Sequence, residues 1–314
     1  MSELTTALRP FFFLIDFELE KPVICPIEDA KRLGFKFEVK DFRNFKHQKR
    51  RINPLALSIA PIPKTTYAKA YHKVKDEICQ GNTFLLNLTF PSVIQNQLDL
   101  EDVFHLAKAP YKLLYQNRFV IYSPECFIKI KDGFIYSYPM KGTIDAEQPK
   151  AKRKLETDPK EINEHNTIVD LIRNDLSKVS KEVSVTRFRY LDKIKTQKKE
   201  IYHTSSEIKG KLPTDWKKKL PEILLSMLPA GSICGAPKAK TVSIIQEVEQ
   251  SPRDYYTGIF GYFDGENLDS AVNIRFLEKK EDQLIYRSGG GITFLSDLES
   301  EYNELIEKIY VPVV

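Results

Sequence analysis

Two short apolar runs joined by Asp132-Gly133 are the feature that most restricts how this chain can fold. Apolar and polar residues alternate through residues 127–130 and 134–138, as in strands with one buried face. Asp-Gly between two such runs is typical of a tight hairpin turn. A similar run at residues 119–122 precedes them. The pattern therefore predicts neighbouring antiparallel strands.

Helices are expected between the strands, which gives a mixed α+β layout. The predicted helices are residues 67–80 with Gly81 as the stop, a helix opened by Asp158-Pro159 that runs toward Leu176, one that starts near Pro237, and one that starts at Ser296. In the last, Ser296 and Glu299 have the spacing of a capping box. The apolar stripe of this helix is Leu298, Tyr302, Leu305 and Ile309.

Length and composition indicate a globular protein with a large core. The chain has 314 residues, of which 42% are hydrophobic, enough for two ordinary domains or one intertwined domain. No repeat or Gly/Ser linker divides it. The apolar run at residues 11–15 ends at Asp16, too short for a signal peptide or a membrane span, so we expect a cytosolic protein. The cysteines lack the CxxC spacing of a zinc site, which favours reduced thiols.

The positive charge does not indicate nucleic-acid binding. The formal net charge of +5 comes from basic clusters at residues 46–51, 150–154, 195–199 and 217–219. These clusters lack interleaved aromatic residues and any known nucleic-acid module, so a solvated surface is expected. A mild positive field would still attract a small dianion.

Lys141 lies in a Pro-Met-Lys-Gly-Thr segment, sixteen residues after Glu125. An amine becomes a nucleophile only when its neutral form is populated, which requires burial or a nearby positive charge. Glu125 could then move the protons. The alternative is that Lys141 is one of many solvent-exposed lysines.

Glu164, Glu301 and Glu304 are candidate metal ligands. Glu301 and Glu304 are three residues apart on the last predicted helix, so they project to nearly the same side. Oxygen-only ligands suit a hard cation such as Mg²⁺. The alternative is a solvated helix face on which Glu304 pairs with Lys308.

Two glycine-containing segments could approach a ligand closely. In residues 231–238, GSICGAPK, free N–H groups ahead of a helix with Pro237 in its first turn would attract a carboxylate, although a plain tight turn is the alternative. In residues 288–292, SGGGI, three consecutive glycines have a high entropic cost. Either a close approach of backbone to ligand or a sharp strand-to-helix connection would explain them.

Arg275 and His203 are further candidates. Arg275 is expected on a strand over residues 271–277, where a buried guanidinium needs a partner such as a bidentate carboxylate from a ligand or from the protein. A lone histidine such as His203 is more often structural than catalytic.

In this order, these segments resemble the chorismate-binding enzymes. The resemblance rests on Ser123-Pro124-Glu125, PMKGT at 139–143, Glu164-His165, IVDLIRND at 168–175, GSICGAPK, SGGGI and Glu301-Tyr302-Asn303-Glu304, and it runs from about Tyr67 to the C-terminus. It implies that family's α+β fold, a large mixed or antiparallel β-sandwich flanked by helices. Residues 1–66 are expected to be a reduced N-terminal segment that packs on a catalytic domain at 67–314. A site for tryptophan feedback is not expected in it.

The resemblance also implies roles for the candidate residues. Glu164, Glu301 and Glu304 would bind Mg²⁺, which holds the ring carboxylate of chorismate. The enolpyruvyl carboxylate would be held by Arg275 and Tyr256, with the main chain of Gly289, Gly290 and Gly291. Ser232 and His203 would line the ring pocket, and Gly142 would also contact the substrate.

Lys141 assigns the subfamily. The anthranilate synthases have alanine at this position, and the isochorismate and salicylate synthases also lack the lysine, whereas lysine is typical of component I of the aminodeoxychorismate synthases. The resemblance therefore implies that Lys141 adds to ring C2 while Glu125 protonates the leaving C4 hydroxyl. Ammonia then adds at C4 and expels the lysine, giving 4-amino-4-deoxychorismate, the precursor of p-aminobenzoate and folate. Leu85, where the family has glutamine or a water-activating lysine, counts against an isochorismate synthase.

Partners and alternatives follow from the same resemblance. The chain shows no glutaminase signature, so a separate glutamine amidotransferase subunit is expected to supply ammonia, and a downstream lyase to consume the product. Neither a membrane nor a nucleic acid is an expected partner. An anthranilate synthase is the first alternative, and a catalytically inactive chorismate-binding regulator is the second.

Overall fold

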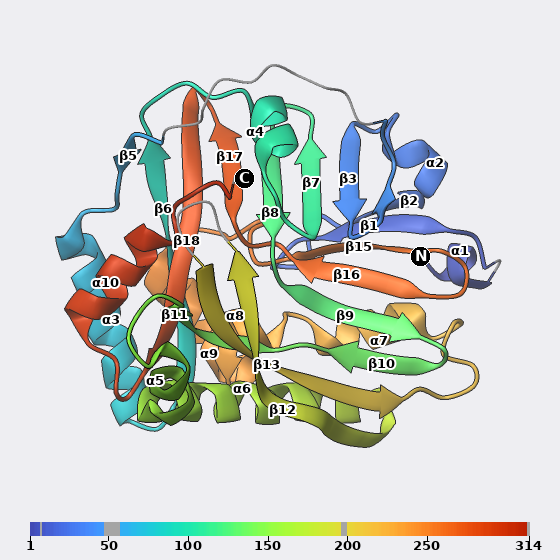
Figure 1. Ribbon diagram of the computed structural model, residues 1–314. Helices are drawn as coiled ribbons and strands as arrows, with labels where there is room; N and C mark the ends of the chain where they lie inside the picture. The colour runs from blue at the N-terminus through green and yellow to red at the C-terminus, as the bar shows by residue number, and fades with distance from the viewer. Residues whose placement is uncertain (7, 47–56, 196–199, 313–314) are drawn as a thin grey trace.

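Two antiparallel sheets form the centre of the molecule (Figure 1). The computed structural model describes residues 1–6, 8–46, 57–195 and 200–312. Of the basic clusters at residues 46–51 and 195–199, all but residues 46 and 195 therefore lie outside the described residues. All the strand pairs described are antiparallel, in agreement with the predicted sandwich.

The first sheet runs from the candidate lysine strand to the N-terminal strands. Its order is β11 (Met140–Asp145), β13 (Glu200–Lys211), β10 (Phe134–Ser137), β9 (Cys126–Lys131), β16 (Leu268–Val272), β15 (Ile259–Phe263), β1 (Phe11–Ile15) and β2 (Val23–Pro26), with β12 (Lys181–Lys195) beside β13.

The second sheet carries the glycine-rich strand. Its order is β14 (Gly235–Ala236), β6 (Leu85–Ile94), β18 (Gln283–Thr293), β17 (Phe276–Lys280), β8 (Phe119–Ser123), β7 (Tyr111–Tyr115), β3 (Phe35–Val39) and β4 (Phe42–Arg43), with β5 (Ile59–Ala60) beside β6.

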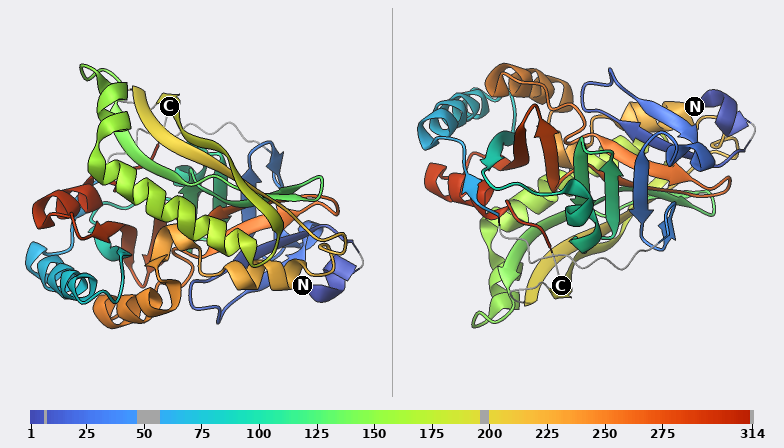
Figure 2. Two further views of the ribbon diagram at one scale, coloured as in Figure 1. Left: turned by 90° about the horizontal axis from the view of Figure 1, so that it is seen from below. Right: turned by 90° about the horizontal axis from the view of Figure 1, so that it is seen from above.

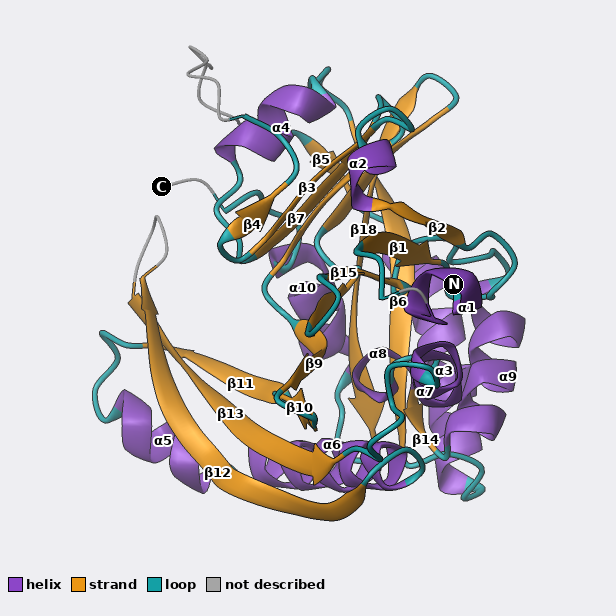
Figure 3. Ribbon diagram, turned by 90° about the vertical axis from the view of Figure 1, so that its right-hand side faces the viewer, coloured by secondary structure: helices purple, strands orange, loops and turns teal. Residues whose placement is uncertain are grey.

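Helices cover the outer faces of these sheets. They are α1 (Ser2–Thr6), α2 (Ile27–Ala30), α3 (Lys64–Cys79), α4 (Leu100–Leu106), α5 (Ala151–Thr157), α6 (Pro159–Ser177), α7 (Leu220–Met227), α8 (Gly231–Cys234), α9 (Lys238–Glu249) and α10 (Leu298–Glu307). Figure 2 shows α3, α9 and α10, in cyan, orange and red, on the same side of the molecule. Helix α6 packs against the long curved strands β12 and β13, and Figure 3 shows the three together in the lower part of the molecule. In the described residues no helix is both long and apolar enough to cross a membrane.

Strand β1 shows where the core lies. All five of its residues are buried, so both of its faces are covered. Phe11 and Phe13 point into the larger core cluster, whereas Phe12 and Leu14 point into the cluster that also holds Phe37 of the second sheet. Burial of such side chains stabilises the fold by about 2 kcal/mol each. Residues near the N-terminus therefore supply a strand that is buried on both faces, while the domain boundary at residue 66 stays a prediction.

The predicted hairpin is confirmed. Strands β9 and β10 pair through Lys131 and Phe134, and the two residues between them have positive φ, 54° at Asp132 and 76° at Gly133. Two successive left-handed residues define the type I′ turn that matches the twist of a hairpin. The helices expected after residue 67, after Asp158 and near Pro237 are confirmed as α3, α6 and α9. Pro237 precedes α9 as its N-cap instead of lying in the first turn.

Two local predictions were wrong. The strand expected over residues 271–277 is broken between β16 and β17, which belong to different sheets, and Arg275 in the break has a positive φ of 55°. The capping box at Ser296 is also wrong, because the carboxylate of Asp297 caps α10 by accepting the N–H of Ser300 at 3.0 Å. The Ser296 hydroxyl instead donates to Glu301 at 2.7 Å.

The glycine run lies inside a strand, not at a connection. Gly289, Gly290 and Gly291 belong to β18 and pair with Thr89, Leu88 and Asn87 of β6. The turn into α10 comes only after Thr293. The strand-to-helix explanation is therefore wrong, and the remaining explanation is a close approach to the glycines.

Candidate active site

Glu125 and Arg275 lie on two neighbouring segments where the chain passes between the sheets. Residues 124–125 connect β8 to β9, and residues 273–275 connect β16 to β17. The N–H of Val272 donates to the carbonyl of Glu125 at 3.2 Å, and the N–H of Tyr122 donates to the carbonyl of Arg275 at 3.2 Å. Because β8 pairs with β17 and β9 with β16, the two crossovers are fixed side by side.

The carboxyl of Glu125 is held by Ser232. The Ser232 hydroxyl donates to Oε1 of Glu125 at 2.5 Å, which joins the GSICGAPK segment to the crossover. Burial raises the pKa of Glu125 above its usual value, opposed by the Ser232 hydrogen bond and by the positive charges of Lys141 and Lys308. A carboxyl with a raised pKa keeps its proton to higher pH, which suits it to act as a general acid.

Lys141 projects into a group of carboxylates, not into solvent. It lies on β11, where Gly142 forms a bulge at φ 76° before the pairing with β13 resumes. Its Nζ is 3.7 Å from Oε2 of Glu164 on α6, and its side chain is 20% exposed. The Thr204 hydroxyl of β13 donates to the Lys141 carbonyl. The strand and the helix together fix the direction of the amine.

Gly290 and Gly291 leave open the space that this group shares. A Cβ on Gly291 would stand 3.3 Å from Nζ of Lys141 and 3.9 Å from Oε2 of Glu164. A Cβ on Gly290 would stand 3.3 Å from both Oε2 of Glu301 and Oε1 of Glu304. The side chains of the lysine and of all three glutamates predicted from the sequence thus converge on Gly290 and Gly291 of β18.

The acidic helix face is buried at Glu301 but remains partly solvated at Glu304, whose side chain is 42% exposed. Glu301 is 1% exposed and accepts the Ser296 hydroxyl, although Glu304 does pair with Lys308 at 2.6 Å as the alternative predicted. Among the residues that the structure describes, no group of three His, Cys, Asp or Glu side chains is placed to hold a metal ion. The carboxylate oxygens of Glu301 and Glu304 beside Gly290 nevertheless have the donor chemistry that Mg²⁺ prefers. The Mg²⁺ site stays a prediction.

Lys308 belongs to this site and was not predicted as a functional residue. Its Nζ donates to the carbonyl of Gly289 at 2.9 Å, in addition to its pair with Glu304. It also lies close enough to Glu125 to favour the ionised carboxyl. The i,i+4 spacing from Glu304 was the available signal, but it indicated only a surface pair.

Arg275 lies on the crossover from β16 to β17, and Tyr256 lies in the segment between α9 and β15. The Nη1 of Arg275 donates to the carbonyl of Lys308 at 2.6 Å, and its guanidinium covers the ring of Tyr310 at 4.5 Å. Tyr256 is 3% exposed, and its ring packs on Phe276, the residue after Arg275. Their predicted role toward a carboxylate stays a prediction.

His203 and Gly142 lie beside the lysine strand. His203 on β13 pairs with Thr143, its Nε2 is 3.7 Å from Asp192, and burial lowers its pKa. Gly142 has a packing reason for being glycine, since a Cβ there would stand 2.7 Å from Oε2 of Glu161. The expected contacts of His203 and Gly142 with a substrate stay predictions.

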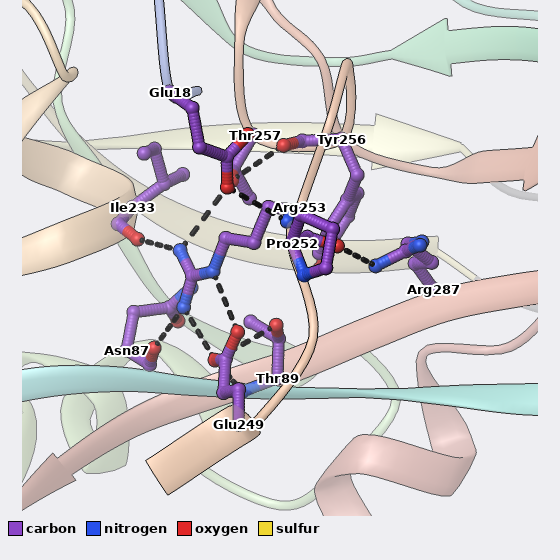
Figure 4. Close-up of polar contacts among 10 residues, drawn as sticks. All are labelled: Glu18, Asn87, Thr89, Ile233, Glu249, Pro252, Arg253, Tyr256, Thr257 and Arg287. Atoms are coloured by element: carbon purple, nitrogen blue, oxygen red, sulfur yellow. Dashed lines mark hydrogen bonds and ion pairs between the residues drawn. The ribbon is translucent and has the colours of Figure 1, made fainter. Parts of the chain in front are cut away.

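The buried Arg253 donates hydrogen bonds to backbone carbonyls of two segments of the site (Figure 4). Arg253 is 1% exposed and pairs with Glu249 at 2.6 Å. Its guanidinium also donates to the carbonyl of Ile233, next to Ser232, at 2.9 Å and to that of Asn87, opposite Gly291, at 2.6 Å. Arg253 was not among the residues predicted from the sequence, although Glu249 and Arg253 have the i,i+4 spacing of a helical pair.

A second ion pair joins two of the sequence motifs. Nζ of Lys238, the last residue of GSICGAPK, lies 2.6 Å from Oδ2 of Asp175, the last residue of IVDLIRND. Asp175 is 3% exposed and also pairs with Lys178 at 2.8 Å. This contact fixes the segment that carries Ser232 against α6, which carries Glu164.

Comparisons with known proteins agree with this architecture. The family described as chorismate binding enzyme matches residues 21–313. An uncharacterized PabA-like protein of Pasteurella multocida is 55% identical, over 97% of this chain and 94% of that protein. Anthranilate synthase component 1 of Acetivibrio thermocellus is 31% identical over 82% of this chain, which spans 53% of that protein. The crystal structure of anthranilate synthase component I from Streptococcus pneumoniae has a TM-score of 0.69 at 26% identity, over 81% of this chain and 58% of that one.

The arrangement combines three chemical functions. An amine and a set of carboxylate oxygens lie beside Gly290 and Gly291, and a carboxyl with a raised pKa lies close enough to the amine to be affected by its charge. Such a set can form a covalent bond to carbon, transfer a proton and bind a hard cation.

Proposed function

This chain belongs to the chorismate binding enzyme family, and we propose that it aminates chorismate at C4 to give 4-amino-4-deoxychorismate. This is the reaction of component I of an aminodeoxychorismate synthase, which leads to p-aminobenzoate and folate. Lys141 would be the covalent nucleophile, and Glu125 would be the acid and later the base.

The observation that carries the proposal is the position of the Lys141 amine. Its nitrogen lies 3.3 Å from where a Gly291 Cβ would stand and 3.7 Å from Glu164. A substrate that rests on the bare backbone of β18 would therefore lie within reach of the amine. A lysine that served only solubility would have no reason to point there.

Glu164, Glu301 and Glu304 would hold Mg²⁺ beside Gly290. The ion would orient the ring carboxylate of chorismate and withdraw electron density from the ring. Arg275 and Tyr256, with the main chain of residues 289–291, would orient the enolpyruvyl carboxylate. Ser232 and His203 would line the ring pocket, and Gly142 would contact the substrate.

The residues of the chain then divide the reaction into two displacements. The Lys141 amine forms a bond to C2 as the ring double bond shifts and the C4–O bond breaks, and Glu125 gives the leaving oxygen its proton. Ammonia forms the C4–N bond, the double bond shifts back, and the C2–N bond to Lys141 breaks. Ionised Glu125 accepts the proton that the new ammonium group loses.

A separate glutamine amidotransferase would supply the ammonia in the cell, and a lyase would consume the product. The PabA-like name of the Pasteurella multocida relative supports a link to an amidotransferase.

Anthranilate synthase is the second candidate because a relative of that name is 31% identical. That activity places nitrogen at C2 and releases pyruvate. Lys141 argues against it, since the anthranilate synthases carry alanine there.

Product analysis tests the proposal. The purified chain is incubated with chorismate, Mg²⁺ and ammonium, and the product is identified by mass spectrometry and NMR. We expect nitrogen at C4 with the enolpyruvyl group retained. Nitrogen at C2, or pyruvate released without a second enzyme, would refute the proposal.

A further inference from the structure

A small cavity lies behind Glu125 and Ser232. It is enclosed by the crossover, by the segment 230–232, and by the apolar side chains of Ile172 and Met227. Neither Lys141 nor Glu164 is among the described residues that line it. The cavity therefore lies next to the proposed binding site for the chorismate ring, and of the residues proposed for that site it shares Glu125 and Ser232.

The size of the cavity decides what it can hold. It offers about 20 Å³ to the centre of a water-sized molecule. One such molecule needs roughly 10–15 Å³ by this measure. A ring such as that of chorismate cannot enter, so the cavity fits a single molecule the size of water or ammonia.

The side-chain polar groups in the cavity wall are acceptors. Asp175 contributes a carboxylate, and Glu125 contributes a second one once it has given its proton to the leaving group. The hydroxyl protons of Ser232 and Ser137 are already donated, to Glu125 at 2.5 Å and to the carbonyl of Phe127 at 3.2 Å. A guest must therefore supply donors. Ammonia brings three N–H donors and one lone pair, whereas water brings two of each, so the lining suits ammonia better.

We propose that this cavity binds one molecule of ammonia and delivers it to the substrate past Glu125. The inference rests on the proposed function, in which ammonia attacks C4 next to the same carboxylate. The nitrogen lone pair forms the C4–N bond, the ring electrons shift, and the C2–N bond electrons return to Lys141. The proton lost by the new ammonium group goes to Glu125, which gave one to the leaving water.

Narrowing the cavity tests the proposal. Ala230, 2% exposed in its wall, has φ −59° and ψ 130°, a conformation that valine adopts readily. Ala107 is a matched control, since it is 0% exposed, has φ −60° and ψ 130°, and packs in a different core cluster. Steady-state rates of wild type, Ala230→Val and Ala107→Val are measured against ammonium and, separately, against chorismate.

We expect Ala230→Val to raise the KM for ammonium by about tenfold or more with the KM for chorismate unchanged, and Ala107→Val to change neither. Ser137→Ala removes one hydrogen-bond acceptor from the cavity wall without adding bulk, so this variant is used if Ala230→Val does not fold. We expect Ser137→Ala to raise the KM for ammonium roughly threefold. Methylamine, one carbon larger, should be a poor nitrogen donor for the wild type.

The outcomes separate the two proposals. An unchanged KM for ammonium in folded Ala230→Val and Ser137→Ala, or efficient use of methylamine, would mean that the cavity holds only a structural water. A wild-type enzyme that incorporates no nitrogen at all would overturn the proposed function together with this inference.

Discussion

The side-chain nitrogen of Lys141 on β11 lies 3.7 Å from the carboxylate of Glu164 on α6, the helix that packs against this strand. The lysine thus points toward the glutamates around Gly290 and Gly291, not into bulk water. The pairing of β11 with β13 positions Lys141, and the packing of α6 positions Glu164. The site therefore depends on the fold as a whole.

Replacing the lysine should abolish the covalent step. We expect Lys141→Ala to lower the single-turnover rate with chorismate and ammonium by at least about 100-fold, because a nucleophile contributes that much or more. Lys218→Ala, at an exposed lysine elsewhere, is the control and should be unaffected. Equal rates for Lys141→Ala and wild type would exclude Lys141 as the nucleophile.

Removing the Ser232 hydroxyl should move the pH profile. The hydrogen bond from Ser232 favours the ionised Glu125 carboxyl and so opposes the rise in its pKa caused by burial. In Ser232→Ala the pKa of Glu125 rises further, so the protonated acid persists to higher pH. The alkaline fall of the single-turnover rate that reports this acid should shift to higher pH. A fall at the same pH, or at lower pH, would show that another group is titrating.

The three glycines should respond differently to alanine. A Cβ on Gly289 would stand 2.3 Å from the carbonyl oxygen of Leu88, so Gly289→Ala should cost about 1–3 kcal/mol of unfolding free energy. On Gly290 and Gly291 the Cβ would meet only the ends of glutamate, lysine and leucine side chains. Gly290→Ala and Gly291→Ala should therefore fold, yet lose about tenfold or more in activity.

Thermal melting and steady-state rates check this series. Gly290→Ala should also raise the Mg²⁺ concentration needed for half-maximal activity, because it fills the space next to Glu301 and Glu304. Equal losses of stability at all three positions would argue that the run is purely structural.

Breaking the buried ion pair should destabilise the fold. Arg253→Met leaves Glu249 buried without its partner, which should cost about 3–5 kcal/mol in urea unfolding. Arg9, whose pair with Glu28 is exposed, provides the control, and Arg9→Met should change stability by less than about 1 kcal/mol. A small loss of unfolding free energy in Arg253→Met would show that the hydrogen bonds from Arg253 to the carbonyls of Ile233 and Asn87 are not needed to hold these segments in place.

Local chemistry explains which parts of the fold were predictable. The Asp132-Gly133 turn and the helix opened by Asp158-Pro159 depend on neighbours in the chain, and both were found where expected. Residues 271–277 look like one strand because their side chains are mostly apolar. They are divided because the chain changes sheets at Arg275, and this depends on pairing with β8 and β9.

The sequence by itself determined the family and the candidate site residues, since the spaced motifs around Lys141, Glu164 and Glu301 are specific enough to identify them. Only the tertiary structure decided that Gly290 and Gly291 lie among them, that Lys308 and Arg253 support the site, and that a cavity lies behind Glu125. The reason is physical. A turn or a helix cap is set by residues a few positions apart, whereas these contacts join strands and helices from distant parts of the chain.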